Sequence, residues 1–345
     1  MAIRKPAVAP AAIVCGAGGF IGHHLVTKLK SRGYTVRGVD LKLPEYGPSS
    51  ADEFLLLDLR NPAACVEAVS GSVPGGGPAE VYQLAADMGG MGFISGADCE
   101  MLRDNAAINA NMIHASAEAG NVRYFFASSV CIYRDMLHGE AALSEDDAYP
   151  ALPANEYGWE KLYSERVALA YARRYRMDVR IARFQNCYGP EGAWQGGREK
   201  VPAAVCRKVA AAQPGDVIEL WGDGSAVRSF VYVDDLVDAV LRLMASDVAA
   251  PTNIGSREYV SIAKLFEIVA AVAGKNLRVR YVPGPVGVQS RNFSNARIES
   301  LGWQAKVSLE EGVGRTYKWV SAQVAAAGDD SDATLSSGNR AALRR

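Results

Sequence analysis

The chain has 345 residues, which is enough for two domains of ordinary size or for one large domain. Its 37 basic and 38 acidic side chains give a net charge of -1, so no overall positive field favours nucleic acid or an anionic membrane. Hydrophobic residues make up 49% of the sequence and charged residues 22%, a composition typical of folded proteins and unlike that of disordered chains.

The first half of the chain alternates short apolar runs with segments of helical period. The apolar runs predict strands at residues 12–15, 35–40, 54–57, 81–85 and 124–127. Helices are expected between these strands, including one at 23–30 and one at 108–119. This alternation predicts an α/β fold with a doubly wound parallel sheet, of the Rossmann type, covered by helices on both faces.

The second half has shorter and more interrupted elements, which predict a smaller, mixed α/β substrate domain. We expect a loop at 189–197, a pair of strands at 217–221 and 229–233, and helices at 235–244 and 262–273. The predicted organisation is a cofactor domain at 11–185 that also receives segments from about 228–257, a substrate domain at 186–327, and a flexible tail at 328–345.

A glycine-rich motif, from Gly16 to Gly22, follows the first predicted strand and opens the first predicted helix. Glycines there would let a pyrophosphate approach the backbone and the helix N-terminus. Asp40 ends the second predicted strand, where a carboxylate accepts both adenosine ribose hydroxyls and repels a 2′-phosphate. NAD is therefore predicted rather than NADP, although Arg37 and Lys42 lie nearby. The cofactor-binding residues predicted are Gly16, Gly19, Phe20, Ile21, Gly22, Asp40, Asp58, Leu59, Ala85, Tyr157 and Lys161.

Tyr157 and Lys161 stand four residues apart, which places both side chains on one face of a helix. A phenol is a poor base at neutral pH unless a neighbouring ammonium stabilises its phenolate, and Lys161 would do so. Ser129 lies at the end of the preceding predicted strand, so its hydroxyl is expected at the edge of the sheet where α/β folds bind ligands. The three residues predict a catalytic group.

The glycine motif, Asp40, Ser129 and the Tyr157–Lys161 pair, in this order, resemble the extended short-chain dehydrogenase/reductase superfamily, which contains sugar-nucleotide epimerases and dehydratases. The resemblance covers about residues 11–325. Four strings are more specific, and they are similar to the GDP-mannose 3,5-epimerase family: residues 84–93, 128–133, 196–204, and 221–224 with 228–230. The resemblance implies an NAD-dependent isomerase that acts on a nucleotide-sugar substrate, with GDP-mannose expected.

The chemistry implied by this resemblance begins with oxidation of C4 of the sugar. A ketone at C4 makes the protons on C3 and C5 acidic, and Tyr157 would take the C4 hydroxyl proton as hydride passes to NAD. In the family, a cysteine and a lysine that match Cys131 and Lys200 then form the acid/base pair on opposite faces of the ring. Inversion at C5 alone gives the gulose form, and inversion at both C3 and C5 gives the galactose form.

Other interpretations of these two residues stay open. A free cysteine is most often a buried small hydrophobe, and this would be the structural interpretation of Cys131. Lys200 belongs to a short charged run, Arg198 to Lys200, of the kind that is usually solvated. The flanking Gly196-Gly197 and Val201-Pro202 favour instead a loop that enters the cleft.

Guanidinium groups suit the phosphate oxygens of a nucleoside diphosphate, and the resemblance points to Arg228 and Arg291. The full set predicted for the substrate is Gly89, Gly90, Met91, Asn186, Glu199, Lys200, Lys208, Arg228 and Arg291. Ala226 and the Gln289-Ser290 pair depart from the family pattern. The four histidines, His23, His24, His114 and His138, form no metal-binding pattern, so no metal is expected.

Two further classes of function remain open. The first is another sugar-nucleotide enzyme of the same superfamily, a 4,6-dehydratase or a 4-epimerase; dehydratases usually have an Asp-Glu pair where this chain has Val130-Cys131. The second is a non-catalytic NAD-binding protein, because fold alone does not establish activity. Six scattered cysteines and the lack of a long apolar run predict a cytoplasmic protein. The resemblance also implies a homodimer through helices near 106–119 and 156–175.

Overall fold

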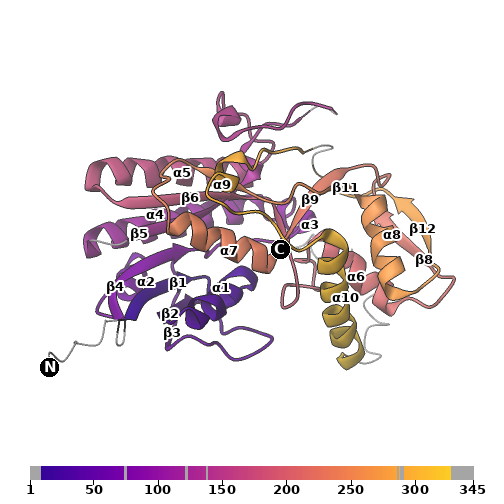
Figure 1. Ribbon diagram of the computed structural model, residues 1–345, viewed down its shortest axis with the longest axis horizontal. Coiled ribbons are helices and arrows are strands. Elements are labelled where there is room, and N and C mark those ends of the chain that lie inside the picture. Colours follow the sequence, from indigo (N-terminus) through magenta and orange to yellow (C-terminus); the bar gives the residue numbers. More distant parts are fainter. Residues whose placement is uncertain are drawn as a thin grey trace.

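The computed structural model describes residues 9–73, 76–120, 123–136, 139–285, 287 and 291–327. The predicted tail at 328–345 lies outside these residues, as do His138, Gln289 and Ser290. A seven-stranded sheet forms the large lobe, and a three-stranded and a two-stranded sheet belong to a smaller lobe. Figure 1 shows the large sheet with its helices on the left and the smaller lobe on the right.

All seven strands of the large sheet are parallel. Their spatial order is β10 (Thr252–Ile254), β6 (Asp178–Phe184), β5 (Arg123–Ser129), β4 (Gly76–Gln83), β1 (Ala9–Cys15), β2 (Thr35–Asp40) and β3 (Glu53–Leu56). The five strands predicted for the first half are confirmed, and they form a doubly wound sheet. The chain winds outward from β1 on one side and from β4 on the other, so the carboxyl ends of these two strands border a ligand-binding crevice.

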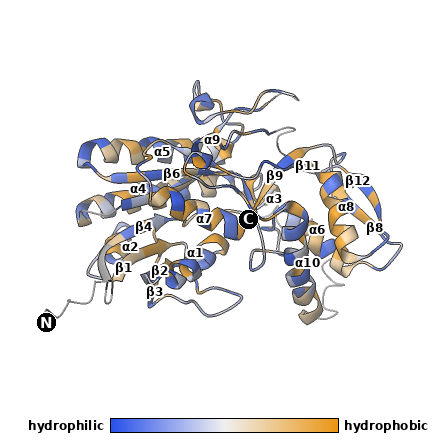
Figure 2. Cartoon of the chain, viewed as in Figure 1, coloured by the Kyte–Doolittle hydropathy of each residue, from blue (hydrophilic) through white to orange (hydrophobic). Residues whose placement is uncertain are grey.

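Strict alternation along β1 explains why the sheet is covered on both faces. Ala11, Ile13 and Cys15 pack on one face with α2 (Pro62–Val69), α4 (Asp98–Ala119) and α5 (Glu156–Tyr175). Ala12 and Val14 pack on the other face with α1 (Phe20–Ser31) and α7 (Val233–Met244). In Figure 2 the covering helices are banded with hydrophobic and hydrophilic residues, as expected for helices with one face on the core and one in water.

The smaller lobe has a different strand pairing from the one predicted. Its three-stranded sheet has the order β11 (Tyr259–Ser261), β9 (Val227–Tyr232), β7 (Asn186–Tyr188), and β8 (Val217–Trp221) pairs in parallel with β12 (Arg278–Val282). Both predicted strands, at 217–221 and 229–233, are present, but the prediction that they form a pair is wrong. The reason is burial: β9 is buried over its last four residues and needs a neighbour on each side, whereas β8 alternates between exposed and buried residues and pairs on the lobe surface.

The chain passes repeatedly between the two lobes. It leaves the large sheet after β6 to form β7, returns with α7 and β10, and leaves again to form β11. Its later helices are α6 (Val201–Ala211), α8 (Ile262–Ala273), α9 (Ala296–Glu299) and α10 (Leu309–Ala326). One apolar cluster consequently joins Val14 and Leu25 of the large lobe to Val205 and Leu265 of the smaller lobe.

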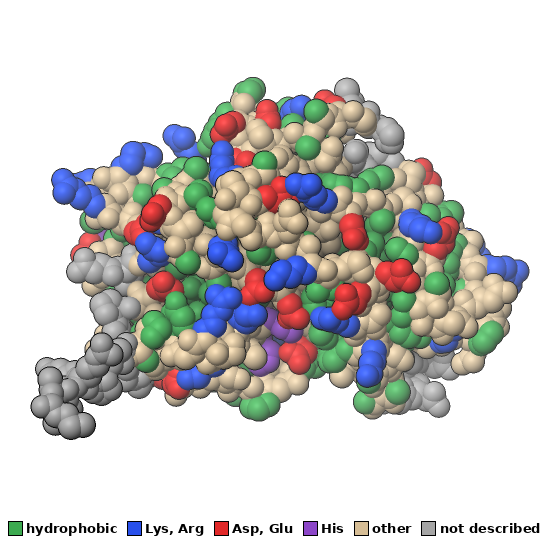
Figure 3. Space-filling model, viewed as in Figure 1, with side chains coloured by type: hydrophobic (Ala, Val, Ile, Leu, Met, Phe, Trp, Pro, Cys, Tyr) green, Lys and Arg blue, Asp and Glu red, His purple; other side chains and the backbone are tan. Residues whose placement is uncertain are grey.

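The remaining helical segments are short: α3 (Met91–Ile94) and two 3-10 turns, η1 (Val130–Ile132) and η2 (Glu145–Ala148). Across the described ranges, no helix combines the length and the apolar character that crossing a membrane requires. Acidic and basic side chains are interspersed on the face of the molecule that Figure 3 shows.

Candidate active site

The turn between β1 and α1 leaves almost no room for side chains. A Cβ on Gly22 would lie 2.0 Å from the carbonyl oxygen of Gly16, and one on Gly18 would lie 2.1 Å from that of Lys42. Gly16 itself has a φ of 88°, a conformation that favours glycine. Gly19 forms the N-cap of α1 without a side-chain hydrogen bond, so the first N–H groups of the helix, from Phe20 and Ile21 onward, are available to an anion.

Asp40 lies at the carboxyl end of β2, and its Oδ2 accepts a hydrogen bond of 2.9 Å from the Gly18 N–H. This bond ties the carboxylate to the glycine turn, as a group that reads the adenosine ribose requires. Of the two cations near Asp40 in the sequence, Arg37 is turned away: its guanidinium pairs with Glu53 at 2.6 Å and donates to the carbonyls of Ala68 and Ser70. The other, Lys42, is exposed and lies 3.6 Å from the Glu45 carboxylate. The residues present fit NAD.

The other predicted cofactor residues lie along the same edge of the sheet. Leu59 is buried in the core beyond β3, and the carbonyl of Ala85, just after β4, accepts a hydrogen bond from the Gln83 side chain. Asp58 is already engaged, because both of its carboxylate oxygens accept hydrogen bonds from Arg60. Arg60 lowers the pKa of Asp58. Contact between Asp58 and the adenine stays a prediction.

The structure brings Ser129, Tyr157 and Lys161 together at the end of β5 and the start of α5. Ser129 ends β5 and its hydroxyl accepts a hydrogen bond of 3.1 Å from the Cys131 N–H. Tyr157 and Lys161 are both buried, and the Lys161 ammonium lies 5.7 Å from the centre of the Tyr157 ring. The four-residue spacing therefore places both side chains on the inner face of α5, as the sequence predicted.

The acidity of Tyr157 is set by its surroundings. Burial raises the pKa of Tyr157 well above its usual value, the charges of Cys131 and Glu160 raise it further, and a hydrogen bond with Ser129 lowers it. These surroundings therefore favour the neutral phenol over the phenolate. A positive charge beside the ring favours the phenolate, and Lys161 is the cation that the chain places there.

Cys131 lies beside Tyr157 in a small cluster of apolar and thioether side chains. The cluster comprises Met88, Met91, Ile94, Met101, Cys131 and Tyr157. The backbones of α5 and η1 approach each other closely at this cluster. A Cβ on Gly158 would lie 2.2 Å from the carbonyl oxygen of Cys131, so only glycine fits at position 158. Cys131 is half-buried, unlike Cys15, Cys65, Cys187 and Cys206, which are fully buried.

Arg228 and Arg291 come from different segments of the smaller lobe and lie near Cys131. Arg291 donates a hydrogen bond of 2.9 Å to the carbonyl of Val130, the residue before Cys131. Burial and the neighbouring Arg291 guanidinium lower the pKa of Arg228 to about 10, and Cys131 acts in the opposite direction. Two guanidinium groups that repel each other in a partly buried site are suited to an anion with more than one negative charge.

Lys200 is the N-cap residue of α6 and lies where the smaller lobe meets the loop before α3. A Cβ on Gly90 would lie 2.4 Å from the carbonyl oxygen of Glu199 and 3.9 Å from the Cα of Lys200. The Gly90 N–H also donates a hydrogen bond of 3.1 Å to the Arg198 carbonyl. Since Met91 belongs to the cluster around Cys131, the backbone at Gly90 connects Lys200 to that cluster.

Three predicted substrate residues have side chains that are engaged within the protein. The Glu199 carboxylate accepts hydrogen bonds from the Gly197 N–H and from Arg207, and so orders its own loop. Lys208 donates a hydrogen bond of 2.6 Å to the carbonyl of Glu219, and burial lowers its pKa. Asn186 donates to the carbonyl of Ser229. The structure does not place these groups in the cluster around Cys131, and their roles toward a substrate stay predictions.

Sequence reasoning missed several buried polar residues next to the site. They are Gln83, Asn109, Glu160, Glu165 and Arg183. A signal was present in α5, whose positions 157, 160, 161, 164, 165 and 168 follow the helical period and are all buried. Polar residues at such positions indicate a buried network.

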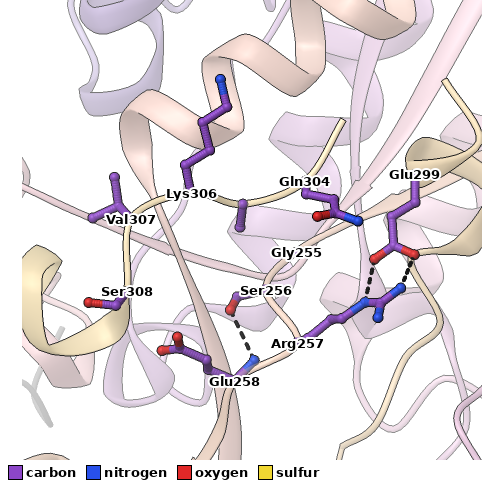
Figure 4. A pocket seen from close by; sticks show the side chains of 10 residues that line it. Gly255, Ser256, Arg257, Glu258, Glu299, Gln304, Lys306, Val307 and Ser308 are labelled. Atoms are coloured by element: carbon purple, nitrogen blue, oxygen red, sulfur yellow. Dashed lines mark hydrogen bonds and ion pairs between the residues drawn. The ribbon is translucent and has the colours of Figure 1, made fainter. Parts of the chain in front are cut away.

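The pocket in Figure 4 lies elsewhere. It has a volume of about 190 Å³ and is lined by residues 255–258, 299 and 304–308, none of which was predicted for the site. Arg257 and Glu299 pair with each other across it. No group of three or more potential metal ligands occurs in the part of the chain that the structure describes.

Comparisons with known proteins agree with this geometry. The profile of the NAD dependent epimerase/dehydratase family matches residues 12–255. The chain is 42% identical over 316 residues to GDP-mannose 3,5-epimerase 1 of Oryza sativa, and 43% identical over 317 residues to GDP-mannose 3,5-epimerase of Arabidopsis thaliana. Each alignment covers 90% of this chain and 82% of the relative.

A solved structure shows the same architecture with its cofactor. The Thermus thermophilus UDP-glucose 4-epimerase in complex with NAD superposes with a TM-score of 0.79 and 26% identity. The superposition covers 90% of this chain and 98% of that one. The fold is therefore that of an NAD-binding epimerase.

Proposed function

Because the chain belongs to the NAD-dependent epimerase/dehydratase family, we propose that it is an isomerase that inverts C5, or both C3 and C5, of GDP-mannose, to give GDP-L-gulose, GDP-L-galactose or both. The identity of 42–43% to the plant enzymes supports this substrate. The observation that carries the proposal is the position of Cys131, which lies in one cluster with the Tyr157 ring. A thiol at this place can act on a carbon next to the one that Tyr157 serves.

The first step is oxidation of the sugar at C4. NAD, when bound at the glycine turn and Asp40, supplies the hydride acceptor and returns the hydride at the end of the cycle. The Tyr157 oxygen takes the proton of the C4 hydroxyl, and the Lys161 ammonium stabilises the phenolate before the transfer. Ser129, which hydrogen-bonds with Tyr157, orients the same hydroxyl. The cycle consumes no external oxidant.

The second step exchanges a proton next to the C4 ketone. Removal of the proton from C3 or C5 gives an enediolate-type carbanion, and delivery of a proton to the opposite face inverts the carbon. Cys131 and Lys200 fill these two roles because they come from different lobes. Cys131 follows β5 of the large sheet, and Lys200 opens α6 in the smaller lobe.

The diphosphate of the substrate binds to Arg228 and Arg291. The two guanidinium groups lie close to each other, and a diphosphate would relieve the repulsion that lowers the pKa of Arg228. The Arg291 guanidinium also donates a hydrogen bond to the carbonyl of Val130, the residue before Cys131. Phosphate binding at Arg291 and the position of Cys131 are therefore linked.

We further propose that the protein is a cytoplasmic homodimer in which α4 and α5 pack against their counterparts. Leu102, Trp159 and Tyr163 are large hydrophobic residues on these two helices, and all three are exposed in the single chain. The six cysteines are free, as in a reducing compartment. The proposed cofactor domain is 11–185 with segments from 228–257, and the proposed substrate domain is 186–327. Light scattering of wild type and of Trp159→Asp tests the dimer: the variant should be monomeric.

Proton NMR of the protein with GDP-mannose in D₂O, without added cofactor, tests the reaction. We expect deuterium to appear at C3 and C5 together with the signals of new GDP-hexoses, and these signals identify the products. A 4-keto-6-deoxy sugar would indicate a dehydratase instead, and inversion at C4 would indicate a 4-epimerase. Binding of NAD without any exchange, for GDP-mannose and for other nucleotide sugars, would favour a non-catalytic NAD-binding protein.

A further inference from the structure

A chain of buried hydrogen bonds runs from β4 to the catalytic face of α5. The Gln83 amide donates to the Ala85 carbonyl and, over 3.0 Å, to Oδ1 of Asn109 on α4. The Asn109 amide in turn donates over 2.8 Å to Oε1 of Glu160 on α5. Ser164 donates to the same oxygen over 2.6 Å. The Glu160 carboxylate is therefore fastened by one oxygen and has a fixed orientation.

The second oxygen of Glu160 is the unusual feature. It is buried and has no hydrogen-bond partner, and it lies 3.7 Å from the Lys161 ammonium. The Glu160 side chain is 0% exposed and that of Lys161 is 4% exposed. Burial of an isolated ammonium is costly, and so is burial of an isolated carboxylate, so each of these two groups offsets part of the cost of burying the other.

We propose that Glu160 is a positioning residue for the Tyr157–Lys161 pair: its buried carboxylate holds the Lys161 ammonium in place beside the Tyr157 ring. Glu160 does not touch the substrate in this arrangement, and acts through Lys161. The inference deepens the proposed function, since it concerns the C4 oxidation that the pair performs.

The charged and titratable groups around the pair are few. Tyr157 faces Cys131 of η1 and hydrogen-bonds with Ser129 of β5. Lys161 lies over the Phe126 ring of β5 at 5.1 Å. Of the other carboxylates near the pair on α5, Glu156 is exposed, and the buried Glu165 is occupied by Arg183 and the Ser128 hydroxyl.

The sign of the effect follows from this arrangement. The Glu160 charge raises the pKa of Tyr157. Removing a negative charge lowers the pKa of every nearby group, so a neutral residue at 160 lets the pair release its proton at lower pH. The Lys161 ammonium, without its carboxylate partner, is held less firmly over the Tyr157 ring, so transfer of the substrate proton to Tyr157 should be slower. The variant should ionise earlier and oxidise its substrate more slowly.

The first test needs no substrate. The tyrosinate absorbance of Tyr157 is measured against pH in the NAD complex, as the difference between each protein and its Tyr157→Phe counterpart. In Glu160→Gln the signal should appear about one to two pH units lower than in wild type. In Glu160→Asp, which keeps the charge, it should stay near the wild-type pH. An unshifted Glu160→Gln signal, or the absence of a Tyr157 signal from both proteins, would overturn the proposal.

The second test measures the reaction itself. Single-turnover reduction of bound NAD by GDP-mannose should be at least about tenfold slower in Glu160→Gln at its optimum, with the acid limb of the pH profile moved down and KM little changed. Ser116→Ala is the matched control, because Ser116 is buried on α4 and donates only to the Met112 carbonyl. If Glu160→Gln reduces NAD more slowly but the acid limb of its pH profile does not move, Glu160 has only a structural role.

A replacement variant and a comparison of the two readouts keep the test decisive. If Glu160→Gln fails to fold, Glu160→Met takes its place, because it also removes the negative charge and should move the same signal in the same direction. If the tyrosinate shift is found but no nucleotide sugar reduces the cofactor, the role of Glu160 stands and the proposed substrate is wrong.

Discussion

Replacing Gly90 with alanine should separate the two chemical steps. The added Cβ would lie 2.4 Å from the Glu199 carbonyl oxygen, whereas ordinary contact begins at 3.4 Å. The backbone at 198–200 must therefore retreat by about 1 Å, and Lys200 moves with it. Since misplacing a reacting group by about 1 Å can lower a rate roughly a hundredfold, proton exchange through Lys200 should fall by about that factor. C4 oxidation should change little, because Tyr157 and Lys161 lie on α5.

The assay compares two rates on the same protein. Deuterium incorporation at C3 and C5 in D₂O reports proton exchange, and the absorbance of NADH formed in a single turnover reports oxidation. Gly92→Ala is the control, because its Cβ would lie 3.6 Å from the Trp221 ring, an ordinary contact. Normal exchange in Gly90→Ala would refute the role of Lys200 or its coupling to Gly90, and an equal loss of both rates would show that the substitution damages the whole site.

Three further predictions follow from other residues. Cys131→Ala should abolish exchange at C3 and C5 while a trace of NADH still forms; loss of both signals together would contradict its assigned role. Lys161→Met should slow NADH formation itself, and a normal single turnover would refute phenolate stabilisation by Lys161. Arg183→Met should lower the free energy of unfolding by about 3–5 kcal/mol in denaturant titrations, because it leaves Glu165 buried without its cation. Adding Glu165→Gln should recover part of that loss, and strictly additive effects would show that the two residues act independently.

Local patterns carried most of what the sequence predicted correctly. The strand, glycine turn and helix at the cofactor site follow one another in the chain, so their motif is readable without knowledge of the rest of the fold. The Tyr157–Lys161 pair is likewise set by the period of a single helix. The partner of β8 was missed because it is β12, far along the chain and largely exposed, with Arg278 and Arg280 among its five residues.

Burial was the other quantity that the sequence did not provide. A glutamate next to a lysine on a helix is usually a solvated ion pair, and Glu160 gives no other sign in the sequence of its contact with Asn109. Arg37 shows the opposite case: in the sequence it lies close to Asp40, the carboxylate predicted to bind the ribose, yet its guanidinium donates to carbonyls at the end of α2.

The repeated passage of the chain between lobes limits how far the site can open. Because α7 and β10 belong to the large lobe but lie between segments of the smaller one, several backbone connections restrain any hinge motion, and one apolar core continues through both lobes. A wide opening would expose that core. A restrained hinge would keep a bound dinucleotide in place from one turnover to the next, as the proposed return of the hydride in every cycle requires. Radiolabelled NAD in solution should exchange with the bound cofactor far more slowly than the enzyme turns over.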